Sequence, residues 1–150
     1  MQPYYRPTVE SDIEPLAAIL REGDKKELQA SSGKNPIEAL TFCFNVSEEC
    51  NSIIYDDKVI GMFGCSRINE DMGSPWLLGS DYIPEIRKAV LTVSKEWVQE
   101  KQKEYKILLN YIDKRNNYAF NWLKYLGFTF VQEIENFGVE ERPFIEFVRI

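Results

Sequence analysis

The chain contains no histidine. This absence excludes histidine-based acid–base catalysis, Ser-His triads and most zinc sites, because each of them needs an imidazole. Cysteine is scarce as well: Cys43, Cys50 and Cys65 form no CxxC motif, which predicts reduced thiols in a cytoplasmic setting. The remaining candidate ligands are scattered along the sequence, so we expect no metal site.

The sequence also lacks a long apolar run and an excess of positive charge. No stretch approaches the roughly 20 apolar residues of a membrane span, and the opening MQPYYRPTVE has neither a signal-peptide nor a transit-peptide pattern. The formal net charge is −6, and acidic residues alternate with basic ones, as in KEWVQEKQKEYK. We therefore expect no membrane insertion and no nucleic-acid binding, because binding a phosphate backbone needs a basic face.

The organisation predicted from the sequence is a single domain over residues 1–150, because no repeat, low-complexity tract or linker divides it. Apolar residues spaced three to four apart predict helices over residues 11–22, 35–46, 84–103 and 116–126. Gly23 is predicted to end the first helix and Gly127 the last. Apolar and alternating runs predict strands over residues 3–7, 51–68 (a hairpin), 75–80, 105–112, 128–134 and 143–150. This order predicts a mixed α/β fold with helices on a central sheet.

Residues 110–128, NYIDKRNNYAFNWLKYLGF, read as a strand followed by a helix that ends on Gly-Phe. Asn116, Ala119, Gly127 and Phe128 stand at the spacing of the last helix of the GNAT N-acetyltransferase superfamily. The opening YYRPTVESDIEPLAAIL is similar to the first strand and helix of that superfamily. Over most of its length the chain therefore resembles the GNAT N-acetyltransferases, which implies a GNAT-like α/β fold with a mixed, mostly antiparallel sheet flanked by helices.

A narrower resemblance rests on the combination of PWLLGSD, a long helix, NYIDKRNNYAFNWLKYLGF and FGVEERPFIEF. This combination is similar to a group of GNAT-like bacteriophage proteins that includes internal virion proteins of short-tailed phages. The resemblance implies a phage-encoded protein in the cytoplasm of the infected host, with packaging in the virion as an alternative.

The GNAT resemblance implies acetyl-CoA as the cofactor and a protein or small-molecule amine as the acceptor. In that superfamily the pantetheine arm enters between two splayed strands, here residues 76–79 and 107–112. The following loop and helix start hold the pyrophosphate, where backbone amides and the helix dipole favour an anion. The residues assigned to the cofactor are Trp76, Leu77, Leu78, Gly79, Arg87, Lys88, Asn116 and Trp122. The structural alternatives are packing for the two tryptophans and helix capping for the asparagine.

Two positions depart from the superfamily pattern. The loop SDYIPEIR (80–87) has no glycine, Pro84 removes an amide donor, and Asp81 and Glu85 bring negative charge to the expected pyrophosphate site. Leu123 stands where many members carry the tyrosine that protonates the leaving thiolate. Asp81 is the best candidate for a general base, acting directly or through a water, and a helix-capping acid is its structural alternative.

Two functions remain open from the sequence. One is an acetyl-CoA-dependent N-acetyltransferase. The other is a virion or host-interaction protein that keeps the fold without the chemistry, for which the stripe Tyr118, Trp122 and Tyr125 offers a partner surface. The oligomeric state is open as well, with a homo-oligomer as one alternative.

Overall fold

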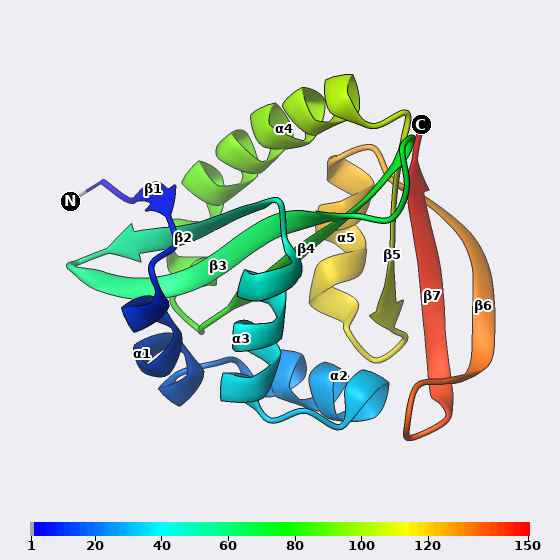
Figure 1. Cartoon of the computed structure of the whole chain (residues 1–150), viewed down its shortest axis with the longest axis horizontal. Coiled ribbons are helices and arrows are strands. Elements are labelled where there is room, and N and C mark those ends of the chain that lie inside the picture. Colours follow the sequence, from blue (N-terminus) through cyan, green and yellow to red (C-terminus); the bar gives the residue numbers. More distant parts are fainter. Residues whose placement is uncertain (1) are drawn as a thin grey trace.

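The computed structural model describes residues 2–150. Its strands form one seven-stranded sheet in the order β1-β2-β3-β4-β5-β7-β6, in which β4 and β5 run parallel and the other neighbours antiparallel (Figure 1). The strands are β1 (Tyr4–Pro7), β2 (Glu49–Tyr55), β3 (Lys58–Arg67), β4 (Met72–Gly79), β5 (Ile107–Asp113), β6 (Thr129–Phe137) and β7 (Arg142–Arg149). The helices are α1 (Ile13–Ala18), α2 (Glu22–Ser32), α3 (Pro36–Val46), α4 (Arg87–Glu104) and α5 (Asn117–Tyr125), with 3₁₀ turns η1 (Glu10–Asp12) and η2 (Ile83–Ile86). The α/β class and the mixed, mostly antiparallel sheet with flanking helices are confirmed.

Helix α2 is the element that the sequence pattern did not predict. Gly23 was expected to end a helix over residues 11–22, but α1 ends at Ala18 and Gly23 lies in the first turn of α2. The helix that follows ends instead at Gly33, which adopts φ 73° and donates its N–H to the carbonyls of Leu28 and Gln29. The sequence of α2, EGDKKELQASS, carries too few apolar residues to show a helical period.

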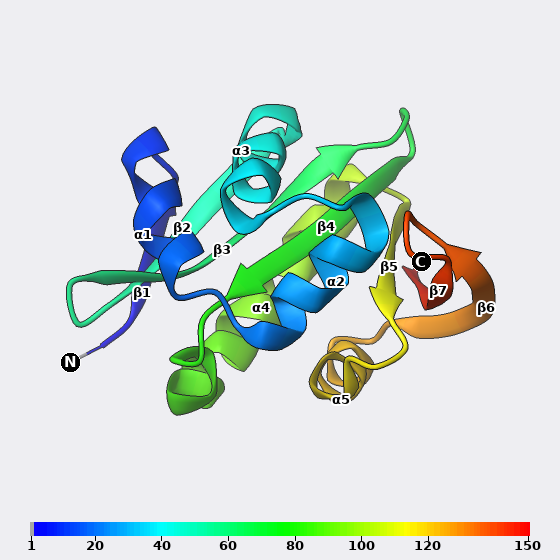
Figure 2. The ribbon, with the colours of Figure 1, turned by 90° about the horizontal axis from the view of Figure 1, so that it is seen from below.

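The helices cover both faces of the sheet (Figure 2). On one face of β1–β4, Leu16 of α1 and Leu40 of α3 pack with Met62 and Leu78 of the sheet. On the other face α4 packs over the same strands, and α5 packs over β5 and β7. Leu123, which stands at the position of the expected tyrosine, is buried in the cluster under α5. Its role in this structure is packing.

None of the helices formed by residues 2–150 is both long and apolar enough to cross a membrane.

Candidate active site between the splayed strands

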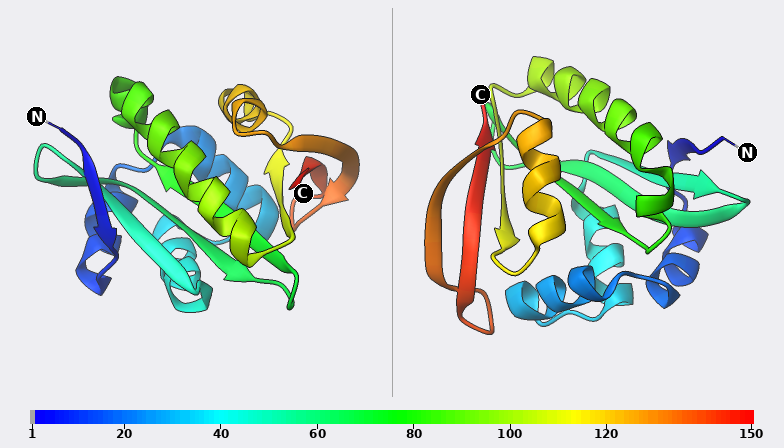
Figure 3. Two further views of the ribbon diagram at one scale, coloured as in Figure 1. Left: turned by 90° about the horizontal axis from the view of Figure 1, so that it is seen from above. Right: turned by 180° about the vertical axis from the view of Figure 1, so that it is seen from behind.

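Strands β4 and β5 are paired only at their first residues. Met72 pairs with Ile107 and Gly73 with Leu108, and beyond that point the two strands diverge toward their carboxyl ends (Figure 3, right). Pro75 has no N–H to continue the ladder. Its carbonyl instead accepts a hydrogen bond of 2.8 Å from the side-chain amide of Asn110 on β5. This bond closes the base of the gap between the strands.

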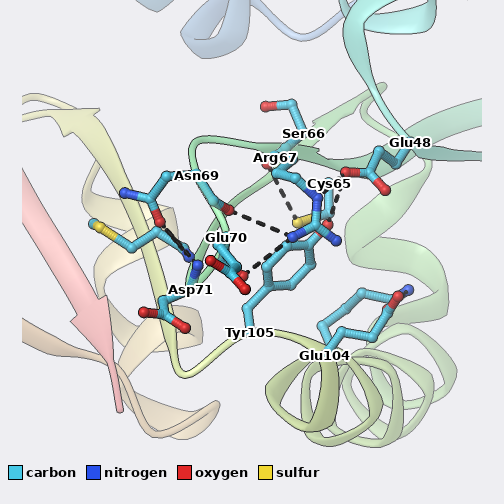
Figure 4. Close-up of polar contacts among 11 residues, drawn as sticks. Glu48, Cys65, Ser66, Arg67, Asn69, Glu70, Asp71, Glu104 and Tyr105 are labelled. Atoms are coloured by element: carbon cyan, nitrogen blue, oxygen red, sulfur yellow. Dashed lines mark hydrogen bonds and ion pairs between the residues drawn. The ribbon is translucent and has the colours of Figure 1, made fainter.

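The paired end is held by Arg67 at the end of β3 (Figure 4). Its guanidinium pairs with Glu48 and donates to the carbonyl of Glu70 (3.2 Å). It also lies 4.7 Å from the ring centroid of Tyr105, the residue that follows α4. Tyr105 is buried against Gly73, where an added Cβ would lie 2.8 Å from the tyrosine ring. The β3–β4 turn and the start of β5 are therefore fixed to each other at the paired end of the gap.

A cavity of about 430 Å³ occupies the gap and extends between α4 and α5 on one side and α2 and α3 on the other. Its size falls in the range of small-molecule sites. The lining is mainly apolar, and it includes the three tryptophans of the chain, Trp76, Trp97 and Trp122. A long apolar ligand arm can therefore be buried between the two strands.

The backbone of Leu77 faces this gap. The Pro75 carbonyl accepts from Asn110 on β5, and the Gly79 N–H donates to a side chain of α2, so both groups point away from β3. Successive residues of a strand direct their backbone groups to alternate sides. Leu77 is two residues from Pro75 and from Gly79, so its N–H and carbonyl point to the same side as theirs, away from β3. They present one donor and one acceptor to a ligand that lies in the gap like a strand.

Helix α2 crosses the open ends of both strands and caps each with a carboxylate. Asp24 accepts a hydrogen bond of 2.9 Å from the Gly79 N–H at the end of β4. Glu27, one helical turn later, accepts a bond of 2.8 Å from the Asp113 N–H at the end of β5. Both carboxylates line the cavity. The two acids thus lie where the gap opens toward α2.

The environment of Glu27 raises the pKa of its carboxyl to about 7. The largest cause is desolvation by burial, and the nearby carboxylates of Asp24 and Asp113 add to it, while the hydrogen bonds from the Asp113 N–H and the Asn116 side chain oppose it. Burial also raises the pKa of Asp24. A carboxyl with a pKa near neutral is suited to exchange protons with a substrate at physiological pH.

Asn116 links the last helix to this acid. Its Oδ1 accepts from the Ala119 N–H (3.3 Å), which caps α5, and its Nδ2 donates to Glu27 Oε1 (3.4 Å). The structural alternative, a helix cap, is therefore present, and the same side chain also lines the cavity.

Replacing Asn116 by alanine is expected to lower the free energy of unfolding by about 1 kcal/mol, because the cap of α5 is lost. Asn116→Ser keeps a capping oxygen but not the amide donor, so it should recover most of that stability. Urea denaturation of the two variants measures the difference. Equal losses in both variants would assign the stabilising role to the bond with Glu27 instead.

The loop after β4 uses most of its own amides. The N–H groups of Ser80, Tyr82, Ile83 and Glu85 donate to oxygens of the protein, and Pro84 has no N–H. The 3₁₀ turn η2 therefore replaces the open amide cradle that the GNAT resemblance implies for a pyrophosphate.

Cationic side chains follow this loop at the start of α4. Arg87 and Lys88 are exposed in the first turn of α4, which contains no acidic residue. Arg87 lines a second cavity, of about 250 Å³, together with Trp122 and Tyr125 of α5. Asp81 is exposed and, among the described residues, does not belong to the lining of either cavity.

The structure thus brings most of the sequence-predicted residues into one place. The residues that line the main cavity are Trp76, Leu77, Leu78, Gly79, Asn116 and Trp122. Arg87 lines the neighbouring cavity, whereas Lys88 and Asp81 lie outside both. Sequence reasoning missed Asp24 and Glu27, because they belong to the helix that it did not predict. The spacing of two acids by three residues in a weakly apolar segment was the only available signal.

In residues 2–150 no group of three or more acidic or cysteine side chains is arranged to hold a metal ion.

No protein-family model and no curated protein sequence matches the chain. Solved structures match it over nearly the whole length. A GNAT superfamily phosphinothricin acetyltransferase from Sinorhizobium meliloti, solved with acetyl-CoA, is 15% identical with a TM-score of 0.70 and covers 99% of this chain and 88% of its own. The chain has the GNAT acetyltransferase fold.

Two further GNAT-fold matches have similar scores. A ribosomal-protein-alanine N-acetyltransferase from Brucella melitensis is 13% identical with a TM-score of 0.73, covering 98% of this chain and 99% of its own. The aminoglycoside acetyltransferase AAC(6')-Ib, solved with coenzyme A, is 11% identical with a TM-score of 0.69, covering 99% and 94%. At these identities the likeness shows the fold. These three acetyltransferases are named for different acceptors, so the GNAT fold alone does not define a substrate.

Proposed function

We propose that the protein is an N-acetyltransferase that uses acetyl-CoA and acts on an amine. One observation carries the proposal: the cavity between the diverging strands β4 and β5 is lined by the carboxyl group of Glu27, whose pKa is about 7. The GNAT fold supports an acyl-CoA ligand, because structures with this fold have been solved with acetyl-CoA and with coenzyme A.

The residues around the gap fit the pantetheine arm of such a donor. The arm is a chain of amides and methylenes, and the free N–H and carbonyl of Leu77 match one of its amides as a neighbouring strand would. The apolar walls formed by Trp97 and Trp122 bury its methylene groups. At the other end of the donor, Arg87 and Lys88 supply positive charge for the phosphates in place of the amides used up in η2.

The chemistry that acetyl-CoA supplies when bound is an acetyl thioester. Glu27 would take a proton from the acceptor amine at the open end of the gap, so that a neutral nitrogen can attack. This assigns to Glu27 the role that the sequence suggested for Asp81. Leu123 offers no acid for the leaving sulfur. A thiol has a pKa of about 8.5, so it can leave as a thiolate near neutral pH without one.

The acceptor side is lined by the carboxyl groups of Asp24 and Glu27, and Glu27 is mostly ionised above a pH of about 7. A protonated amine is attracted to such a site before it is deprotonated there. We therefore infer that the acceptor is cationic in its resting form, either an amino group of a protein or a small amine.

A second candidate function is a phage-encoded GNAT-fold protein that acts through contacts, in the host cytoplasm or packaged in the virion. One observation favours it beside the resemblance to phage proteins. On helix α3, Phe42 and Val46 lie one turn apart on the same side and are each about half accessible to solvent, which is an apolar surface of the kind used for binding proteins. A homo-oligomer formed through this face is a further form of the same candidate.

Isothermal titration of the purified protein with acetyl-CoA, and with coenzyme A in parallel, tests the two candidates. Micromolar binding followed by release of free thiol in the presence of amines is expected for the acetyltransferase. An absence of heat and of any thermal shift at millimolar acetyl-CoA would reject it and leave the contact role.

A further inference from the structure

The three tryptophans of the chain line the same cavity but differ in one respect. The indole N–H of Trp76 donates to Ser47 Oγ at 2.8 Å, and that of Trp97 donates to Glu49 Oε2 at 2.6 Å. The indole nitrogen of Trp122 is buried, and within residues 2–150 no atom accepts its hydrogen. Buried indole donors are normally paired, as the other two show.

Trp122 lies on α5 between the two cavities. It belongs to the lining of the main cavity and of the smaller one that contains Arg87. A ligand that runs from the gap between β4 and β5 toward the start of α4 must therefore pass Trp122. The residue with the unpaired donor therefore borders that path.

An unpaired donor of this kind disfavours folding, because its hydrogen bond to water is lost and nothing replaces it. Phenylalanine would fill nearly the same space without this penalty. The indole is thus an unfavourable choice for packing alone and a favourable one if a ligand supplies the acceptor.

We propose that the Trp122 indole N–H donates a hydrogen bond to a carbonyl oxygen of the acyl donor's pantetheine arm. This inference rests on the proposed function, since it names acetyl-CoA as the ligand. It makes Trp122 a binding residue for the arm, placed one position before the leucine that occupies the site of the expected tyrosine acid.

The test compares Trp122→Phe with Trp76→Phe and Trp97→Phe, by titration with acetyl-CoA and by thermal denaturation of the free protein. Trp122→Phe is expected to bind acetyl-CoA about 10-fold more weakly, while its melting temperature stays unchanged or rises, because the deleted donor was unpaired. Trp76→Phe and Trp97→Phe should each lower the melting temperature, because Ser47 and Glu49 lose a partner.

A second measurement needs no folded variant of Trp122. In protein labelled with ¹⁵N-tryptophan, one indole N–H resonance should move on saturation with acetyl-CoA, and comparison with Trp76→Phe and Trp97→Phe assigns it by elimination. Unchanged affinity in Trp122→Phe, or an unmoved Trp122 resonance at saturation, would overturn the inference while leaving the proposed function intact. Failure of the wild-type protein to bind acetyl-CoA would overturn both.

Discussion

Glu27→Gln is expected to lower the rate of acetyl transfer by about 10²–10⁴-fold, the usual contribution of a general base. Glutamine keeps an oxygen that can accept from the Asp113 N–H, so the end of β5 stays capped while the proton acceptor is removed. In the wild type, kcat/KM should rise with pH and level off above about 7, following the pKa of Glu27. The variant should lack this rise. The ionisation of the acceptor amine also depends on pH, but it affects both proteins equally and so does not cause the difference between them.

The same substitution should change stability in the opposite direction to activity. The pKa of Glu27 is about 7 in the folded protein and 4.5 in the reference state, so the folded state binds more protons between these values. Stability contributed by this group is complete below about pH 4.5 and is lost as the pH rises to 7. At pH 8, Glu27→Gln should therefore be more stable than the wild type by about 1–3 kcal/mol, at roughly 1.4 kcal/mol per pKa unit.

Glu22→Gln on the same helix is the matched control. The Glu22 side chain is 74% exposed, so its replacement should change neither the rate nor the pH dependence of unfolding. Chemical denaturation at pH 4.5 and pH 8, beside steady-state rates, measures both effects. A Glu27→Gln variant that retains wild-type activity would remove Glu27 from the mechanism.

Gly138→Ala is expected to have the largest effect on folding among the substitutions near the site. Gly138 lies in the β6–β7 turn with φ 73°, and an added Cβ would lie 2.5 Å from the carbonyl oxygen of Ala30 at the end of α2. The turn is bound to the same helix by Val139 N–H to Ser31 (3.2 Å) and Glu140 N–H to Ala30 (3.1 Å). The clash would force these elements apart and shift α2, the helix that carries Glu27.

Gly33→Ala separates this clash from backbone strain. Gly33 has the same φ of 73°, but a Cβ there would meet only Val139 Cγ2, at an ordinary 3.5 Å. Both substitutions should cost about 1 kcal/mol for the left-handed conformation. Gly138→Ala should cost at least about 2 kcal/mol more and should also reduce kcat/KM, because the contact is with backbone that cannot move alone. Equal unfolding free energies in the two variants would contradict this account of how the β6–β7 turn positions α2.

The parts of the fold that follow from local sequence were predictable. The helix over α4 shows a clear apolar period, Gly127 ends the last helix in the left-handed conformation with φ 89°, and the apolar runs of β3, β5 and β7 are strands. These features depend on residues close together in the chain, so their pattern survives without tertiary contacts. Helix α2 could not be predicted in this way, because few of its residues are apolar. Its Asp24 and Glu27 instead bind the ends of β4 and β5.

The candidate site also has one part that could be predicted from the sequence and one part that could not. The segment that carries Asn116, Trp122 and Leu123 could be recognised, because its spacing is contained within one helix. That Glu27 lies against Asp113 and Asn116 could not, since 86 and 89 residues separate these partners. A carboxylate on a polar helix looks solvated in sequence, and only the crossing of α2 over the open ends of β4 and β5 desolvates it and raises its pKa.

The sequence by itself determined the α/β class, the closing strand–helix unit and the absence of histidine chemistry, because composition and short-range periodicity are written along the chain. The tertiary structure alone decided where the strands part, which carboxyl group lies at the opening, and which tryptophan keeps an unpaired donor. Those properties depend on groups from distant segments sharing one low-dielectric space, and no local pattern records which groups will share it.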